Sequence, residues 1–162
     1  MIMSTFQGAE NSYKNSIERS YSLEQELTKT PKVLIVEDDE ALLASMRDII
    51  GLGHEKDIFS ADNAKDGVDL FMKLKESLNL AILDINMPLA KGVSADLSGL
   101  DILRFMIAQK PSLRIILSTG YDFQKDVRDL LDEPSVTMLK KPYDAEDLIG
   151  AVDKALNFSV EP

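Results

Sequence analysis

The strongest constraint on the fold is a regular alternation of short β-branched runs with longer amphipathic segments, which begins at Lys32. The first run, KVLIV at 32–36, has the continuous apolar character of a strand that is buried on both faces. The next segment places apolar residues at helical spacing and ends at two glycines, Gly51 and Gly53. Because this alternation repeats along the chain, it predicts a parallel sheet covered on both faces through right-handed crossovers.

The same pattern gives a range for each predicted element. The predicted strands are 32–36, 55–61, 79–84, 113–119 and 135–141, and the predicted helices are 39–50, 64–77, 99–110, 122–131 and 144–157.

The regular pattern also sets the predicted domain organisation. Residues 1–31 are polar with apolar residues at only loosely helical spacing, and we expect a flexible N-terminal arm or linker. Residues 32–158 are predicted to form one domain, and 159–162 a C-terminal tail. We expect no secretory signal, because no basic segment is followed by an apolar one. No apolar run approaches the roughly 20 residues of a membrane span, so we also expect no membrane insertion.

The composition narrows the classes of function. The 162 residues carry a net charge of −10, and a surface of this sign repels nucleic acid and anionic lipid. We therefore expect no direct binding of nucleic acid. The absence of cysteine excludes disulfides and thiolate chemistry, and it fits a cytoplasmic protein.

Charged and hydroxyl side chains follow four of the predicted strands at the point where each strand ends. They are Glu37, Asp38, Asp84, Ser118, Thr119, Lys140 and Lys141. In doubly wound folds, binding sites form beyond the carboxyl ends of the parallel strands. One acid after a strand is most often only a turn residue, but four such strand ends in one small domain favour a site.

Four short motifs in this order resemble those of a known family, the receiver domain of two-component response regulators. They are LIVEDDE from Leu34, LDINMP from Leu83, LSTGY from Leu117 and KKPY from Lys140. The resemblance covers 32–158. It implies an α/β doubly wound (βα)5 fold of the flavodoxin-like type, with a five-stranded parallel sheet in the order 2-1-3-4-5.

The resemblance also implies roles for individual residues. Asp84 corresponds to the phosphoacceptor, Thr119 to the hydroxyl that contacts the phosphoryl group, and Lys141 to the positive counterpart before a cis proline, Pro142. In the order 2-1-3-4-5, Asp38 and Thr119 flank Asp84 at the roughly 4.8 Å spacing of neighbouring strands. The strand before Lys141 lies two places away, a gap that the long lysine side chain can span.

The crowded acids after the first strand are explained by a metal. By the resemblance, Asp38 and Asp84 are direct ligands of Mg²⁺, Asn86 adds its backbone carbonyl, and Glu37 acts through water. Hard oxygen ligands suit Mg²⁺, and Mn²⁺ or Ca²⁺ are expected substitutes. Without a cation, these carboxylates would raise one another's pKa values. Asp39, in contrast, is expected to favour the dipole at the start of the first helix.

The implied function is a signalling switch rather than an enzyme with an external substrate. The expected partners are a histidine kinase or phosphotransfer protein, an unidentified downstream target or output domain, and a second copy bound through 122–131, 135–141 and 144–157. A phosphatase of the haloacid dehalogenase type is disfavoured, because that class needs an acid where this chain has Asn86. A phosphorylation-independent interaction module on the same fold stays open.

Two features depart from the family pattern. Met138 occupies the position of a usual aromatic switch residue, so the usual route of signal transmission is not expected here. Gly92 satisfies the usual glycine spacing after Pro88, but the helical pattern restarts only at Gly99. Residues 89–98 therefore contain an insertion, interpreted either as a tolerated surface loop or as a mobile lid over the site.

Overall fold

The computed structural model describes residues 14–17, 30–87, 98–120 and 133–157. The chain divides into two compact units, Met1–Thr30 and Pro31–Pro162. In the first unit, residues 14–17 are helical. The predictions of a flexible arm, a C-terminal tail, a helix at 122–131 and a surface loop or lid in 89–98 fall largely or wholly outside the described residues. Among those that are described, no helix combines the length and apolar character that crossing a membrane requires.

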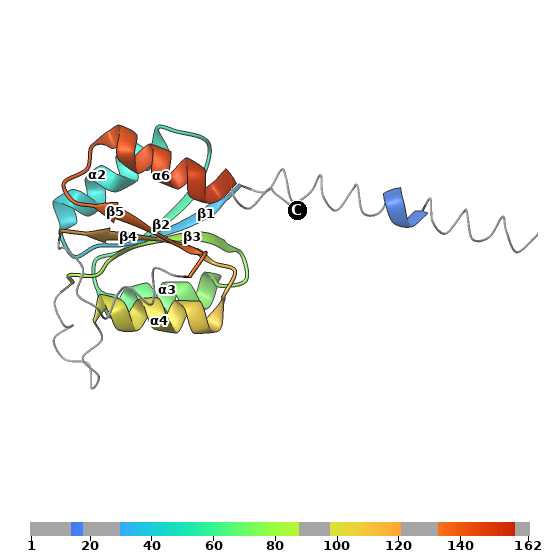
Figure 1. Cartoon of the computed structure of the whole chain (residues 1–162), viewed down its shortest axis with the longest axis horizontal. Helices are drawn as coiled ribbons and strands as arrows, with labels where there is room; N and C mark the ends of the chain where they lie inside the picture. Colours follow the sequence, from blue (N-terminus) through green and yellow to red (C-terminus); the bar gives the residue numbers. More distant parts are fainter. Residues whose placement is uncertain (1–13, 18–29, 88–97, 121–132, 158–162) are drawn as a thin grey trace, which may run out of the picture. The chain divides into compact units, whose positions relative to one another are not determined.

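The second unit contains a five-stranded sheet in the order β2-β1-β3-β4-β5 (Figure 1). Every neighbouring pair of these strands is parallel. The predicted fold class and strand order are therefore confirmed. The strands are β1 (Lys32–Val36), β2 (Asp57–Ala61), β3 (Leu78–Asp84), β4 (Arg114–Thr119) and β5 (Val136–Lys140).

Helices cover both faces of this sheet. Figure 1 places α2 (Glu40–Gly51) and α6 (Ala145–Asn157) on one face, and α3 (Ala64–Leu74) and α4 (Gly99–Gln109) on the other. Side chains alternate along a strand. In β1, Val33 and Ile35 accordingly pack with the α2 and α6 residues, whereas Leu34 and Val36 pack with those of α3 and α4. This double burial explains the uninterrupted apolar run that predicted the strand.

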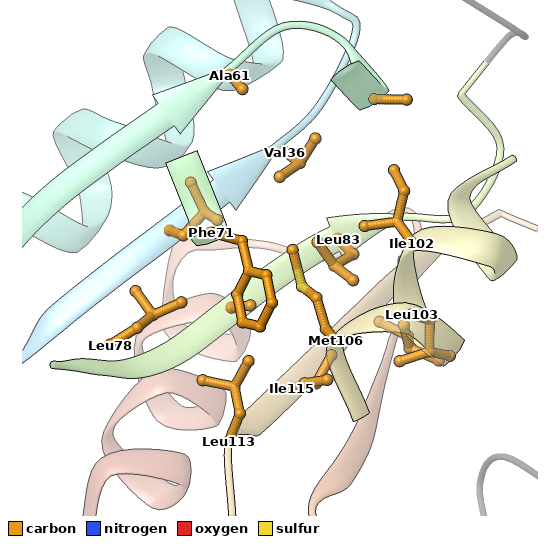
Figure 2. Packing of buried hydrophobic residues seen from close by; sticks show 14 of the residues in the cluster. Val36, Ala61, Phe71, Leu78, Leu83, Ile102, Leu103, Met106, Leu113 and Ile115 are labelled. Carbon is orange, nitrogen blue, oxygen red and sulfur yellow. The ribbon is translucent and has the colours of Figure 1, made fainter. Parts of the chain in front are cut away.

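The core on the α3 and α4 side is built around large buried side chains, shown in Figure 2. Phe71 of α3 and Met106 of α4 are both fully buried against the sheet. The Phe71 ring also meets Phe105 edge to face, with ring centroids 5.9 Å apart. Full burial of one such side chain contributes roughly 1.5–3 kcal/mol. This core holds β1, β3 and β4 together, and their carboxyl ends carry the polar residues considered below.

Two helix starts are fixed close to those strand ends. The Asp39 carboxylate accepts hydrogen bonds from the backbone N–H groups of Ala41 and Leu42, so Asp39 is the N-cap of α2. Ser98 caps α4 and exchanges hydrogen bonds with Asp101 in a capping box. The helix after the inserted segment therefore begins at Gly99, as the sequence pattern predicts.

Gly99 lies in direct contact with the backbone at the end of β3. A Cβ atom built on Gly99 would lie 2.5 Å from Ile85 Cα and 2.6 Å from the Asp84 carbonyl oxygen. Only a residue without a side chain fits such a close backbone approach. The first turn of α4 is thus seated on the residue that follows Asp84.

Candidate functional site

The polar residues at the strand ends converge at one edge of the sheet. The register pairs Asp84 of β3 with Ser118 of β4, and Thr119 with Lys140 of β5. Glu37 directly follows β1, whose last residue pairs with the residue before Asp84. Parallel pairing therefore brings residues that are up to 104 positions apart in the sequence to one place.

Lys141 is the centre of this arrangement. Its Nζ atom lies 2.7 Å from Asp84 Oδ2 and 2.9 Å from Glu37 Oε2. The side chains of Glu37 and Asp84 are almost fully buried, while that of Lys141 is 22% exposed. The Lys141 backbone N–H donates to the Thr119 carbonyl at 2.7 Å. The lysine that was predicted as the positive counterpart of Asp84 thus contacts it directly.

Burial and charge shift the pKa values of this cluster. Burial raises the pKa of Glu37 above its ordinary value, opposed by the hydrogen bond from Lys141 and reinforced by the charge of Asp84. Burial acts to lower the pKa of Lys141, but the hydrogen bonds and charges of Asp84 and Glu37 outweigh it and raise that pKa overall. The ammonium group of Lys141 is therefore charged at neutral pH.

Three carboxylates of the site have the arrangement of a metal-binding cluster. Glu37, Asp38 and Asp84 each offer one oxygen, and these oxygens all lie within 4.8 Å of one another. Glu37 and Asp84 are buried and Asp38 is exposed, so the cluster opens to solvent on one side. One lysine against three acids leaves a negative excess. Hard oxygen donors in this number suit a divalent cation such as Mg²⁺, so the donor set fits the expected metal.

Asn86 orients the other oxygen of Asp84. Its backbone N–H donates to Asp84 Oδ1 at 2.7 Å, while Oδ2 faces Lys141. The Asn86 side-chain amide reaches Thr119 Oγ1 at 3.5 Å. Thr119 is fully buried. All the residues predicted for the site are thus brought to one edge, where Asn86 links Thr119 to Asp84. Their roles, including that of the Asn86 carbonyl, stay predictions.

The structure adds one residue, Tyr143, that the sequence analysis did not assign to the site. The Tyr143 hydroxyl lies 3.3 Å from the Oγ atom of Ser118, the residue that precedes Thr119 on β4. The only sequence signal was an aromatic next to Lys-Pro and a second hydroxyl residue before Thr119. The Lys141–Pro142 peptide is cis, as expected from the resemblance.

Met138 lies on β5, and its side chain is exposed to 40%. It has no aromatic ring to move between a buried and an exposed position. Met138 is thus an exposed methionine on an edge strand of the described sheet. That the usual aromatic switch does not operate here stays a prediction.

The fold and the clustered site match those of known proteins. Residues 33–153 match the model of the response regulator receiver domain. A receiver domain protein from Clostridium thermocellum has a similar solved structure, with a TM-score of 0.69, 26% identity, and coverage of 80% of this chain and 96% of that one. The chain therefore belongs to the response regulator receiver domain family. Members of this class serve in signalling through two-component systems.

Two curated relatives indicate the range of proteins that contain such a domain. Sporulation initiation phosphotransferase F of Bacillus subtilis is 25% identical over 77% of this chain and 93% of its own length. A probable transcriptional regulatory protein of Picosynechococcus is 28% identical over 81% of this chain. The present chain spans only 51% of the length of that regulator.

Proposed function

We propose that this receiver accepts a phosphoryl group on Asp84 in a Mg²⁺-dependent reaction and thereby changes its affinity for a signalling partner. The observation that carries this proposal is the contact between Lys141 Nζ and Asp84 Oδ2, beside the acid cluster of Glu37, Asp38 and Asp84. A buried carboxylate is a competent nucleophile when positive charge stands ready for the incoming phosphoryl oxygens.

The reaction is a direct displacement. An Asp84 carboxylate oxygen forms a bond to phosphorus, the bond between phosphorus and the donor atom breaks, and the donor leaves with that electron pair. Lys141 then exchanges part of its contact with Asp84 for the phosphoryl oxygens, and the Thr119 hydroxyl donates to one of them. The product is an acyl phosphate. Attack by water at phosphorus breaks the bond to the Asp84 oxygen, releases inorganic phosphate and regenerates the carboxylate.

Glu37, Asp38, Asp84 and the Asn86 carbonyl are the residues that would hold the cation, with Mn²⁺ or Ca²⁺ as substitutes for Mg²⁺. The bound cation supplies further positive charge to the phosphoryl oxygens. The chain's own contribution is to gather the acids and to keep Lys141 aimed at Asp84. This division of roles explains why Glu37 and Asp38 follow β1 side by side, while the next acid, Asp39, caps α2.

The proposed donor is the phosphohistidine of a histidine kinase or of a phosphotransfer protein. The printed name of the Bacillus subtilis relative, a phosphotransferase, supports phosphoryl transfer as the activity of similar chains. The downstream partner is a separate target or an output domain, and the 51% coverage of the longer Picosynechococcus regulator is the observation that motivates the second alternative. We place the reaction in the cytoplasm, consistent with the absence of cysteine.

The test is intact-mass measurement after incubation with acetyl phosphate, a small phosphodonor, and Mg²⁺. We expect a gain of one phosphoryl group that disappears in excess EDTA and in Asp84→Asn. Asp57→Asn, which changes an exposed acid at the start of β2, is the matched control and should be phosphorylated normally. A folded protein that never gains the group would favour the phosphorylation-independent interaction module.

A further inference from the structure

A chain of hydroxyl contacts lies on the α2 and α6 side of the site. The Tyr143 hydroxyl lies 3.3 Å from Ser118 Oγ and donates to Met46 Sδ at 3.5 Å. Ser118 is fully buried and Met46 is 1% exposed. The three residues come from β4, from the turn after β5 and from α2. One phenol group therefore links β4 and α2 to the turn that contains Lys141.

The hydroxyl protons of the Ser118–Tyr143–Met46 contacts can be assigned in one consistent order. The sulfur of Met46 carries no proton, so it accepts from the Tyr143 hydroxyl. The Tyr143 proton is then engaged with Met46, so the Tyr143 oxygen accepts the hydrogen bond that the Ser118 hydroxyl donates. Because Ser118 is buried, its hydroxyl depends on the Tyr143 hydroxyl as its hydrogen-bond partner.

The Ser118–Tyr143 contact bears on Lys141 because the turn that contains Lys141 is bonded to β4 on both sides, at the neighbouring residues Thr119 and Ser118. Before the turn, the Lys141 N–H donates to the Thr119 carbonyl at 2.7 Å. After it, Tyr143 reaches the neighbouring residue, Ser118. Ser118 itself is the residue that pairs in register with Asp84. The Lys141 backbone is thus fixed relative to the strand position next to Asp84.

We infer that the Tyr143 hydroxyl, through Ser118, is a positioning group that holds the ammonium of Lys141 on Asp84. Lys141 bridges from the end of β5 to β3, and it reaches Asp84 Oδ2 only if its backbone stays in place. A displacement of about 1 Å in such a group can reduce a rate by as much as about a hundredfold. Neither hydrogen-bond partner of the Tyr143 hydroxyl belongs to the acid cluster, so its loss affects phosphorylation rather than metal binding.

The experiment compares Tyr143→Phe, Ser118→Ala and their double variant. Tyr143→Phe removes only the hydroxyl and keeps the ring in the core. Ser77→Ala is the matched control, because it also removes a side-chain hydroxyl with two hydrogen-bond partners, Lys32 and Leu74, but at the opposite end of the sheet. The inference rests on the proposed function for its kinetic readout, so a second readout independent of phosphorylation is included.

The first readout is the NMR signal of the Lys141 ammonium protons in the metal-free protein at neutral pH, assigned by its loss in Lys141→Met. We expect a signal that persists in the wild type and in Ser77→Ala, and that shifts and broadens in both Tyr143→Phe and Ser118→Ala. An unchanged Lys141 signal in Tyr143→Phe would overturn the inference. This result does not depend on whether Asp84 accepts a phosphoryl group.

The second readout is the rate of phosphorylation by acetyl phosphate at saturating Mg²⁺, with Mg²⁺ affinity measured separately. We expect each single variant to be about threefold to tenfold slower with an Mg²⁺ affinity within twofold of wild type. The double variant should be no slower than the singles, because both changes break one link. Additive losses, or an equal loss in Ser77→Ala, would contradict a specific link. A wild type that is not phosphorylated would refute the proposed function and leave the NMR result to decide the inference.

Discussion

Lys141 Nζ and Asp84 Oδ2 lie 2.7 Å apart, although the two residues are separated by 57 positions in the sequence. This contact joins the end of β5 to the end of β3 across β4, and it places an ammonium group against a buried carboxylate. The same ammonium also contacts Glu37. Lys141 thus offsets part of the negative charge of the site and bridges Glu37, after β1, to Asp84, at the end of β3. It is therefore the first residue to test.

Replacement of Lys141 by Met should destabilise the metal-free protein. The change removes the ammonium donor from the buried carboxylates of Asp84 and Glu37, and hydrogen bonds to charged groups contribute about 1.5–3 kcal/mol. Because Lys141 is partly exposed, we expect a loss near the lower end of that range. Urea unfolding at neutral pH in EDTA measures it. Lys65→Met breaks the fully exposed pair with Asp69 and should leave the midpoint almost unchanged; an equal effect in both variants would contradict the account.

Glu37→Gln should stabilise the metal-free protein at neutral pH. Burial raises the pKa of Glu37 above its ordinary value of 4.5, so the folded protein holds the Glu37 proton more tightly than the unfolded chain. Ionised Glu37 therefore costs stability, fully so above its raised pKa, and this cost vanishes as pH falls below 4.5. Urea midpoints across this pH range should show an advantage of Gln that shrinks with falling pH. A stability advantage of the Gln variant that grows as pH falls would contradict a raised pKa of Glu37.

Asp38→Ala and its neighbour Asp39→Ala should separate metal binding from helix capping. Asp38 is an exposed member of the acid cluster, so its loss should weaken Mg²⁺ binding tenfold or more with little effect on folding. Asp39 caps α2, so its loss should cost about 1 kcal/mol of stability while Mg²⁺ affinity is kept. Titration calorimetry and the shift of the thermal midpoint with added Mg²⁺ measure both effects. The assignment of Asp38 would be wrong if its variant bound Mg²⁺ as tightly as wild type.

Gly99→Ala should displace the backbone next to Asp84, although Gly99 itself is not a residue of the acid cluster. The added methyl group would meet Ile85 Cα and the Asp84 carbonyl oxygen, both backbone atoms that cannot turn aside. We expect a loss of about 1–3 kcal/mol and slower phosphorylation, because the residue after Asp84 must shift. Gly150→Ala in α6 meets nothing within 4 Å and should instead stabilise the protein by about 0.5–1 kcal/mol. Unchanged stability of Gly99→Ala would mean that α4 adapts without moving β3.

The sequence predicted the sheet well because its three central strands, β1, β3 and β4, are mostly apolar and almost entirely buried. The run at 32–36 is buried on both faces, and only a strand inside a covered parallel sheet needs such a run. The site residues followed from the same logic, since parallel strands bring their carboxyl ends to one edge. The pairing of Lys141 with Asp84 was implied by the resemblance to receiver domains, and the strand order agrees with it.

The contacts that the sequence did not predict depend on packing rather than on periodicity. Gly92 fits the usual glycine spacing and lies outside the described residues, whereas the described contact with the Asp84 backbone is made by Gly99. The Ser118–Tyr143 contact joins residues of two separate motifs, and no local pattern states that their hydroxyls meet. Such contacts are set by the exact distance between β4 and the turn after β5, which a sequence pattern does not specify.

The central claim is that Asp84 is the residue that becomes phosphorylated, and reductive trapping tests it most directly. The protein is incubated with Mg²⁺ and acetyl phosphate and then treated with borohydride, which reduces an aspartyl phosphate to homoserine. Peptide mapping by mass spectrometry locates the converted residue. The account predicts homoserine at position 84 alone, with none in the presence of excess EDTA. Conversion of another acid such as Asp38, or no conversion in a folded protein that binds Mg²⁺, would contradict it.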